Sequence, residues 1–181
     1  MTAEPIRTAR LTLLPLAVAH AREMAQVLAD PALYTFTGGE PPTPDALRAR
    51  YARQVAGPDD PGTEWLNWVV RVDRSGRLAG YVQATVTNRA TGGATADVAW
   101  VVGTEWQGQG IAREAALGMR RLLARHGVRD LTAHIHPEHT ASSGVARALG
   151  LTPSGEADED GEIVWRGRTD GRPAMRTDGQ P

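Results

Sequence analysis

The chain has 181 residues and a net charge of −1, with 20 arginines but no lysine and no cysteine. Its length favours one domain that needs no disulfide or structural metal, and its charge argues against nucleic-acid binding through bulk electrostatics. The lack of cysteine excludes disulfides and thiolate chemistry. No apolar run reaches the roughly 18 residues of a membrane span, so we expect a cytoplasmic protein without a membrane partner.

The amino-terminal part of the chain is predicted to form a strand and then a short helix. Residues from Arg10 to Leu14 alternate in polarity and are closed by Pro15, as is typical of a strand. Apolar residues at helical spacing from His20 to Leu28 predict a helix that ends at Asp30-Pro31.

A loop and a second helix are predicted next. The segment from Tyr34 to Pro42 is rich in glycine and proline, which indicates a surface loop that could cover a pocket. Thr43 followed by proline is typical of a helix start, and a buried face is predicted for three residues spaced four apart, Leu47, Tyr51 and Val55. Gly57-Pro58 should end this helix.

The middle of the chain has the pattern of β-strands. Segments 64–72 and 78–87 are rich in β-branched and aromatic residues and flank a turn, so they predict an antiparallel hairpin. A second turn from Asn88 to Gly93 leads into a third strand, Ala94 to Val102.

A glycine loop follows that third strand and precedes a helix. Gly108 and Gly110 carry no Cβ, so backbone amides can approach a ligand closely. The helix, predicted from Ile111 to His126 with Gly127 as its stop, adds unsatisfied donors at the positive end of its dipole. Together these features predict a binding site for a phosphate or pyrophosphate.

The carboxy-terminal part is predicted to contain a strand, a short helix and a strand pair. They cover Leu131 to His136, Thr140 to Leu149, and Leu151 to Gly155 with Glu162 to Arg166. Residues 1–166 would form the single domain, and residues 167–181 have the composition of a disordered tail.

Two familiar phosphate-binding loops are excluded. A Walker loop requires a lysine, which this chain lacks. A dinucleotide fingerprint would need glycine or alanine at Arg113 and an acidic residue near the end of the next strand, and the sequence has neither.

The segment Gln107-Gly-Gln-Gly-Ile-Ala112 resembles the acyl-CoA signature of the GNAT N-acetyltransferases. A second block, from His136 to Leu151, resembles the segment that follows at family spacing, and Ile6 to Leu16 is similar to the opening of the RimJ/RimL branch. The resemblance runs from Ile6 to Arg166. It implies an α/β fold with a mixed, mostly antiparallel sheet, flanking helices and splayed central strands.

The resemblance also implies acetyl-CoA as co-substrate, in a cleft between the strands that end at Val102 and His136. Pantetheine would bond to the backbone of the first strand and the pyrophosphate to the loop amides, while His139 replaces the family's usual asparagine. The implied coenzyme-binding residues are Trp100, Val101, Val102, Gln107, Gly108, Gln109, Gly110, Ile111, Ala112, Arg113, His139 and Ser142.

The reaction implied is direct attack of a primary amine on the thioester. Asp97 aligns with an acidic residue thought to deprotonate the amine in this branch, and Ser142 with the suggested thiolate partner, since Ala146 replaces the family's tyrosine. An amide near Val101 or Val102 would polarise the carbonyl. From residue type alone, Asp97 could equally be a solvated strand residue and Ser142 a helix-lining one.

The acceptor and the wider role stay open at this level. A protein N-terminus and a small-molecule amine both suit the resemblance, and the loop from Thr35 to Pro44 would shape their pocket. The residues His134, His136, Glu138 and His139 suggest a metal, but they form no evident closed ligand set, so we expect none. A homodimer is common in the family. The alternative function is a non-catalytic acyl-CoA sensor.

Overall fold

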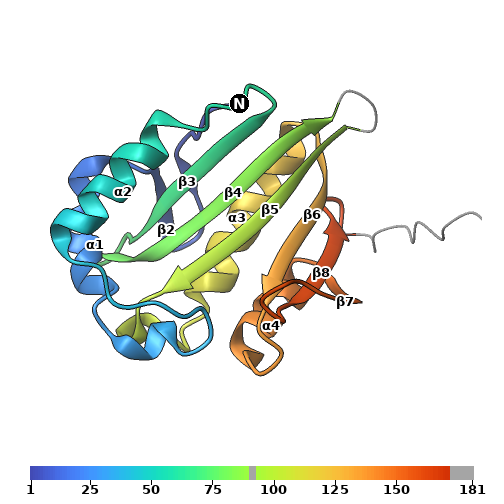
Figure 1. Cartoon of the computed structure of the whole chain (residues 1–181). Coiled ribbons are helices and arrows are strands. Elements are labelled where there is room, and N and C mark those ends of the chain that lie inside the picture. Colours follow the sequence, from blue (N-terminus) through green and yellow to red (C-terminus); the bar gives the residue numbers. More distant parts are fainter. Residues whose placement is uncertain (90–92, 172–181) are drawn as a thin grey trace, which may run out of the picture.

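A single twisted sheet organises the chain in the computed structural model, which describes residues 1–89 and 93–171 (Figure 1). Within the described residues, eight strands are ordered β1-β2-β3-β4-β5-β6-β8-β7. Their bounds are β1 Ile6–Arg7, β2 Leu11–Pro15, β3 Thr63–Val72, β4 Leu78–Arg89, β5 Gly93–Val102, β6 Val128–Ile135, β7 Thr152–Ala157 and β8 Ile163–Arg168. The mixed, mostly antiparallel sheet expected from the family resemblance is therefore confirmed.

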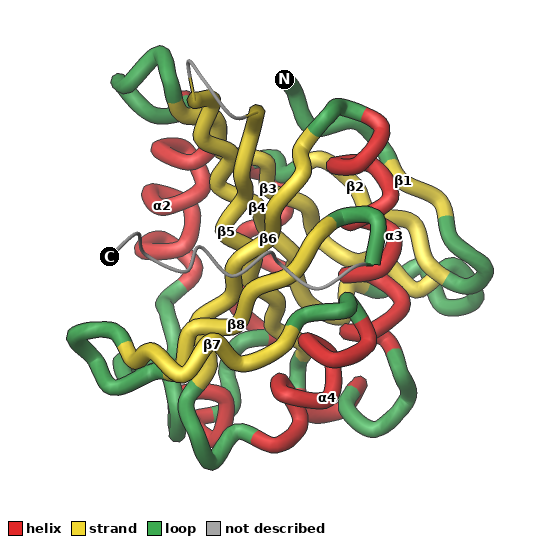
Figure 2. Tube along the Cα trace, turned by 90° about the vertical axis from the view of Figure 1, so that its right-hand side faces the viewer, coloured by secondary structure: helices red, strands yellow, loops and turns green. Residues whose placement is uncertain are grey.

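Helices cover both faces of this sheet. They are α1 Ala21–Val27, α2 Pro44–Ala56, α3 Ile111–Arg125 and α4 Thr140–Ala148, with short 3₁₀ turns η1 Val18–His20, η2 Pro31–Tyr34 and η3 Thr104–Trp106. Figure 2 shows α2 and α3 on opposite sides of the sheet. In the described residues, no helix combines the length and apolar character needed to cross a bilayer.

Strand alternation divides the buried residues between two cores. On β3, Leu66, Trp68 and Val70 pack in the core shared with α3 and α4, whereas Val69 points to the core under α1 and α2. The predicted hairpin of β3 and β4 is confirmed, with Val69 opposite Tyr81. The predicted start of α2 is confirmed as well, because the Thr43 hydroxyl accepts a hydrogen bond from the Ala46 amide at 3.1 Å.

The sheet opens between β5 and β6. These two strands pair in parallel only from Ala94 to Asp97 on β5 and from Val128 to Thr132 on β6. Beyond that point β6 continues to pair with β8, while β5 continues to pair with β4. The two strands thus separate, each held by its outer neighbour.

Two predictions of local structure need correction. Val55 is 54% exposed, because the face of α2 that contacts the sheet ends near Tyr51. Strand β8 runs past residue 166 to Arg168, and the Thr169 hydroxyl donates to the Val128 carbonyl at 2.7 Å, so residues 167–169 belong to the domain. The predicted tail from 172 onward, and positions 90–92 of the predicted second turn, lie outside the described residues.

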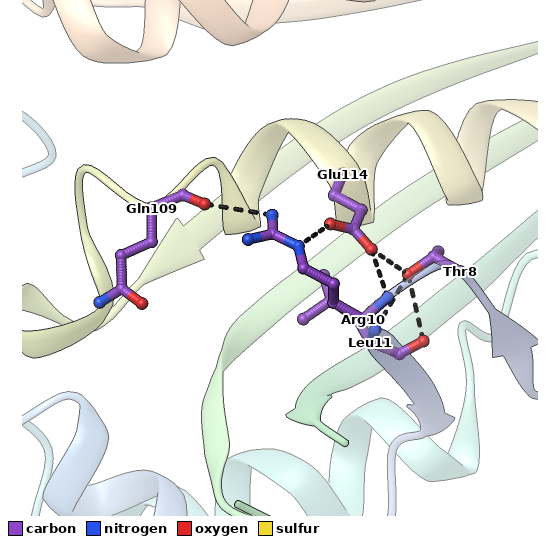
Figure 3. Close-up of polar contacts among 5 residues, drawn as sticks. All are labelled: Thr8, Arg10, Leu11, Gln109 and Glu114. Carbon is purple, nitrogen blue, oxygen red and sulfur yellow. Dashed lines mark hydrogen bonds and ion pairs between the residues drawn. The ribbon is translucent and has the colours of Figure 1, made fainter. Parts of the chain in front are cut away.

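An ionic clamp fastens the amino-terminal strands to the start of α3 (Figure 3). One oxygen of Glu114 accepts hydrogen bonds from the Thr8 hydroxyl at 2.6 Å and from the Arg10 amide at 2.9 Å. Its other oxygen accepts from Arg10 Nε at 2.7 Å, and the same guanidinium donates to the Gln109 carbonyl at 3.1 Å. The loop before α3 is therefore tied to a segment about 100 residues earlier in the chain.

Gly80 should tolerate no side chain. A Cβ there would lie 2.1 Å from the Val101 carbonyl oxygen, so β4 and β5 would have to separate. We predict that Gly80→Ala lowers the free energy of unfolding by about 3 kcal/mol or more. The matched control is Gly144→Ala in α4, where a Cβ meets nothing within 4 Å and should stabilise by up to about 1 kcal/mol. Urea unfolding measures both, and equal effects would contradict the prediction.

The clamp should make stability depend on pH. Partial burial alone would raise the pKa of Glu114, but the hydrogen bonds from Thr8 and Arg10 outweigh it, so the pKa lies below its ordinary value. The ionised group therefore stabilises the fold above about pH 4.5, and this contribution is lost as the pH falls through the lowered pKa. Glu114→Gln should weaken the loss of stability between pH 6 and pH 3, measured by urea unfolding, whereas Glu159→Gln at an exposed turn should leave it unchanged.

Candidate active site

The loop between β5 and α3 is shaped by glycine conformation and by two glutamine side chains. Gly108 and Gly110 adopt left-handed backbone angles, with φ of 73° and 76°, which favour glycine. Gln107 Nε2 donates to the Val102 carbonyl and Gln109 Nε2 to the Glu105 carbonyl, each at 3.1 Å. The loop is therefore held in a defined conformation by contacts of its own.

The start of α3 presents free backbone donors. Gly110 is its N-cap, and its carbonyl accepts from the Glu114 amide at 3.0 Å. The preceding amides of Ile111, Ala112 and Arg113 have no intrahelical acceptor, because the first turn of any helix lacks one. These donors lie at the positive end of a 15-residue helix, an arrangement that suits an anion.

A cavity of about 470 Å³ occupies the opening between β5 and β6 and reaches this loop. Eleven of the predicted coenzyme-binding residues line it, namely Trp100, Val101, Val102, Gln107, Gly108, Gly110, Ile111, Ala112, Arg113, His139 and Ser142. Gln109 does not line the cavity, since its side chain bonds to Glu105 and its carbonyl accepts from Arg10.

The β5 side of this cavity offers backbone groups as well as side chains. Residues 98–102 pair with β4 on one side only, because β6 has already diverged. In a strand, successive residues direct their amides and carbonyls to opposite sides. Alternate residues of this segment therefore direct an amide and a carbonyl toward the cavity, where an extended ligand could bond to them.

Phe36 covers part of the cavity. Its ring, the only phenylalanine of the chain, stacks on His139 at 4.5 Å between centroids and contacts His136 at 5.2 Å. Burial, and then the neighbouring His136, lower the pKa of His139, so this ring is a neutral hydrogen-bonding group at pH 7. The prediction that the loop from Tyr34 to Pro42 could cover a pocket is thereby supported, although nothing in the sequence singled out Phe36.

Asp97 lies where the two strands part. It is paired with Thr132 at the last parallel step and lies opposite Thr85 on β4. Its neighbours Ala96 and Val98 are buried in the core under α3, so the exposed Asp97 side chain points to the opposite face of the sheet. Asp97 therefore lies beside the cavity, which begins at Val98, rather than within its wall.

Ser142 and Ala146 have different environments on α4. Ser142 is half-buried and lines the cavity, together with Val145. Ala146 is fully buried in the core, so this position is directed away from the cavity. Sequence reasoning missed one other aromatic residue that lines the cavity, Tyr81. Trp106 also lines it, and its buried indole nitrogen has no hydrogen-bond partner among the described residues.

An ion-paired cluster borders the cavity at the carboxy-terminal strand pair. His134 Nδ1 lies 2.6 Å from Asp158 Oδ2, and the potential ligand atoms of His134, Asp158 and Glu162 all lie within 4.8 Å of one another. The bond with His134 lowers the pKa of Asp158, while burial and then the Asp158 charge raise that of Glu162. Among the described residues, His136, Glu138 and His139 do not join this cluster.

Comparison with known proteins agrees with this geometry. The family model described as "Acetyltransferase (GNAT) domain" matches residues 10–152. A GNAT-family acetyltransferase from Bacillus anthracis has a similar structure, with a TM-score of 0.75 and 16% identity over 92% of this chain and 99% of that one. No curated protein sequence matches this chain.

Two further solved structures contain a coenzyme. The RimL ribosomal L7/L12 α-N-protein acetyltransferase in complex with coenzyme A has a TM-score of 0.75 and 18% identity, over 93% of this chain and 99% of that one. The microcin C7 self-immunity acetyltransferase MccE, with acetyl-CoA and AMP, has a TM-score of 0.69 and 15% identity, over 89% and 93%. At such identities the likeness concerns the fold alone, but the family model covers most of the sequence, and the chain therefore belongs to the GNAT family of acetyltransferases.

Proposed function

We propose that this acetyltransferase transfers the acetyl group of acetyl-CoA to a primary amine by direct attack in a ternary complex. One observation carries the proposal. The cavity between β5 and β6 runs from the unpaired backbone of β5 to the free amides at the start of α3. Acetyl-CoA is an elongated molecule with a flexible arm and a pyrophosphate. Its arm could bond to the β5 backbone while its pyrophosphate bonds to the amides of α3.

The proposed placement of acetyl-CoA follows from these groups. Amides from Gly108 to Arg113 would bind the pyrophosphate, and the exposed Arg113 side chain could add a charged hydrogen bond. The pantetheine arm would bond to the backbone of Trp100, Val101 and Val102. The neutral His139 ring would contribute a hydrogen bond rather than a charge.

The chemistry requires a neutral amine. A protonated α-amino group has a pKa of about 8 and a lysine amine one of about 10.4, so a base must take the proton near pH 7. Asp97 is proposed as that base, acting through water, because its side chain lies beside the cavity where the strands part.

Bond formation and cleavage then involve two further groups. The amine nitrogen attacks the thioester carbon, and an amide of Val101 or Val102 stabilises the charge that develops on the carbonyl oxygen. The C–N bond forms and the C–S bond breaks. The half-buried Ser142 is proposed to donate a hydrogen bond to the departing thiolate and to relay to it the proton that the nitrogen loses as the amide forms, so that the serine hydroxyl is regenerated.

Asp97→Asn should lower turnover mainly at low pH. General-base catalysis contributes about 10²-fold or more, and the loss should shrink as the pH rises and the free amine becomes abundant. The measurement is kcat against pH from thiol release, with Asp59→Asn at an exposed loop as the matched control. A pH profile of Asp97→Asn that overlies the wild-type profile would exclude Asp97 as the base.

The clamp of Arg10 should affect coenzyme binding more than chemistry. Arg10→Gln removes the hydrogen bonds that hold the Gln109 carbonyl and Glu114, so the loop amides would be less well positioned. We expect KM for acetyl-CoA to rise about threefold to tenfold with kcat nearly unchanged. Arg7→Gln, at an exposed residue of the neighbouring strand, is the control. A fall in kcat without a change in KM would contradict this role.

The alternative proposal is a non-catalytic acyl-CoA sensor. It is favoured by Ala146, which replaces the family's usual tyrosine and has no hydroxyl group that could protonate the departing thiolate. Tight binding of acetyl-CoA by calorimetry, with no thiol release across peptides, polyamines and aminoglycosides, would support the sensor. Turnover with any of these amines would exclude it.

A further inference from the structure

A second cavity lies on the other face of the sheet, between α2 and the strands β3 and β4. Its volume is about 250 Å³, which is smaller than most pockets for drug-sized ligands and suits a small polar group. Seven polar or aromatic residues contribute to its lining, namely Arg50, Tyr51, Gln54, Asn67, Trp68, Tyr81 and Gln83.

Tyr81 connects this second cavity to the proposed coenzyme cleft. Tyr81 lines both cavities, and on β4 it lies opposite Val101, one of the residues that line the cleft. Gln83 and the exposed Asp97 lie on this same sheet face, because Gln83 pairs with Ala99 and Asp97 is two residues before Ala99. A ligand in the second cavity can therefore extend past Tyr81 toward the proposed base.

Two residues that line the second cavity each carry a buried polar atom without a partner within the described residues. These atoms are the Tyr51 hydroxyl and Asn67 Nδ2, and the Tyr51 side chain is only 4% exposed. Leaving such groups unpaired is unfavourable, because each has lost its water without gaining a hydrogen bond. Both can donate, so a ligand with acceptor oxygens would satisfy them together.

The charge of the second cavity selects the ligand further. Arg50 on α2 is the charged residue of its lining, and of the described residues that line it none carries a carboxylate. Burial raises the pKa of Tyr34, Tyr51 and Tyr81, and the positive charge of Arg50 acts in the opposite direction on all three, so the guanidinium lies near this tyrosine cluster. Arg50 forms no ion pair with a described carboxylate. A polycation would be repelled here, whereas a carboxylate would be bound.

Strand spacing sets the length of the ligand. Asn67 on β3 pairs with Gln83 on β4, which pairs with Ala99 on β5. Neighbouring strands lie about 4.8 Å apart, so a ligand must span about 10 Å from Asn67 to β5. An extended chain spans about 3.5 Å per residue, so a free α-amino acid or a dipeptide is too short, whereas a tripeptide spans about 10 Å.

We propose, building on the proposed function, that the acceptor is a short peptide whose free carboxylate binds Arg50, Tyr51 and Asn67 while its amine reaches past Tyr81 to the acetyl group. The second cavity is thus a carboxylate subsite of the acceptor site. It makes the enzyme select small peptides over polyamines, aminoglycosides and the N-termini of long chains.

The test compares peptides of one to four residues, each as the free acid and as the C-terminal amide. Acetylation is measured by mass spectrometry and by thiol release. We expect kcat/KM to peak at three residues and to be at least about tenfold higher for the acid than for the amide, as one charged hydrogen bond implies. Equal rates for acids and amides, or a faster reaction with long amidated peptides or polyamines, would overturn the inference.

Substitutions test whether the residues of the second cavity cause the preference for acids over amides. Arg50→Gln should abolish the preference for acids, so that kcat/KM becomes equal for the acid and the amide of each peptide. Tyr51→Phe, which keeps the ring, should weaken the preference by a smaller factor. Arg48→Gln, an exposed arginine of the same helix outside the cavity lining, should leave the preference intact. Loss of the preference in Arg48→Gln, or its survival in Arg50→Gln, would assign it to another site.

Measurements of peptide binding test this inference independently of the proposed function. If no amine is acetylated, the proposed function fails, and calorimetry with coenzyme A present decides the subsite on its own. Tighter binding of the tripeptide acid than of its amide, lost in Arg50→Gln, would support the carboxylate subsite without turnover. Equal binding of the acid and the amide would overturn it.

Discussion

The structure depends on one interrupted strand pairing. Parallel bonding between β5 and β6 stops after Asp97, and each strand is then held only by its outer neighbour. Backbone groups inside a protein are rarely left without partners, since each unpaired group is costly. The edge of β5 that no longer pairs with β6 is tolerated because it faces a cavity, in which a ligand or water can bond to its backbone groups.

Binding of an anion at this opening also requires that the glycine loop before α3 be rigid. Left-handed glycines alone would leave the loop able to adopt many conformations. Gln107, Gln109 and Arg10 restrict it through bonds to backbone carbonyls, and Glu114 ties Arg10 to the helix that follows. Donors held in place before binding lose less entropy when the ligand arrives, which favours affinity.

Local signals in the sequence predicted most of the fold. The Thr43 cap, the Gly127 stop and the alternation of β3 and β4 act over a few residues, so they can be read without knowing the tertiary structure. Val55 continued the helical pattern of α2 but is exposed, because burial depends on where the helix leaves the sheet.

The cavity walls were harder to predict, because they combine distant segments. The glycine loop was recognisable as an anion site from its own residues. Phe36 and Tyr81 carried no such signal, since their contacts with the region after β6 and with the cavity depend on the sheet order. The unpaired Tyr51 hydroxyl was likewise invisible, because an absent hydrogen bond is a property of the folded arrangement alone.

The Phe36 stack links the two cavities along the chain. Phe36 belongs to the connection between η2 and α2, and α2 carries Arg50 and Tyr51. The segment that lines the first cavity at Phe36 therefore continues directly into the helix that lines the second. This covalent connection is a physical route by which binding in one cavity can be coupled to binding in the other, and any such coupling must act equally in both directions.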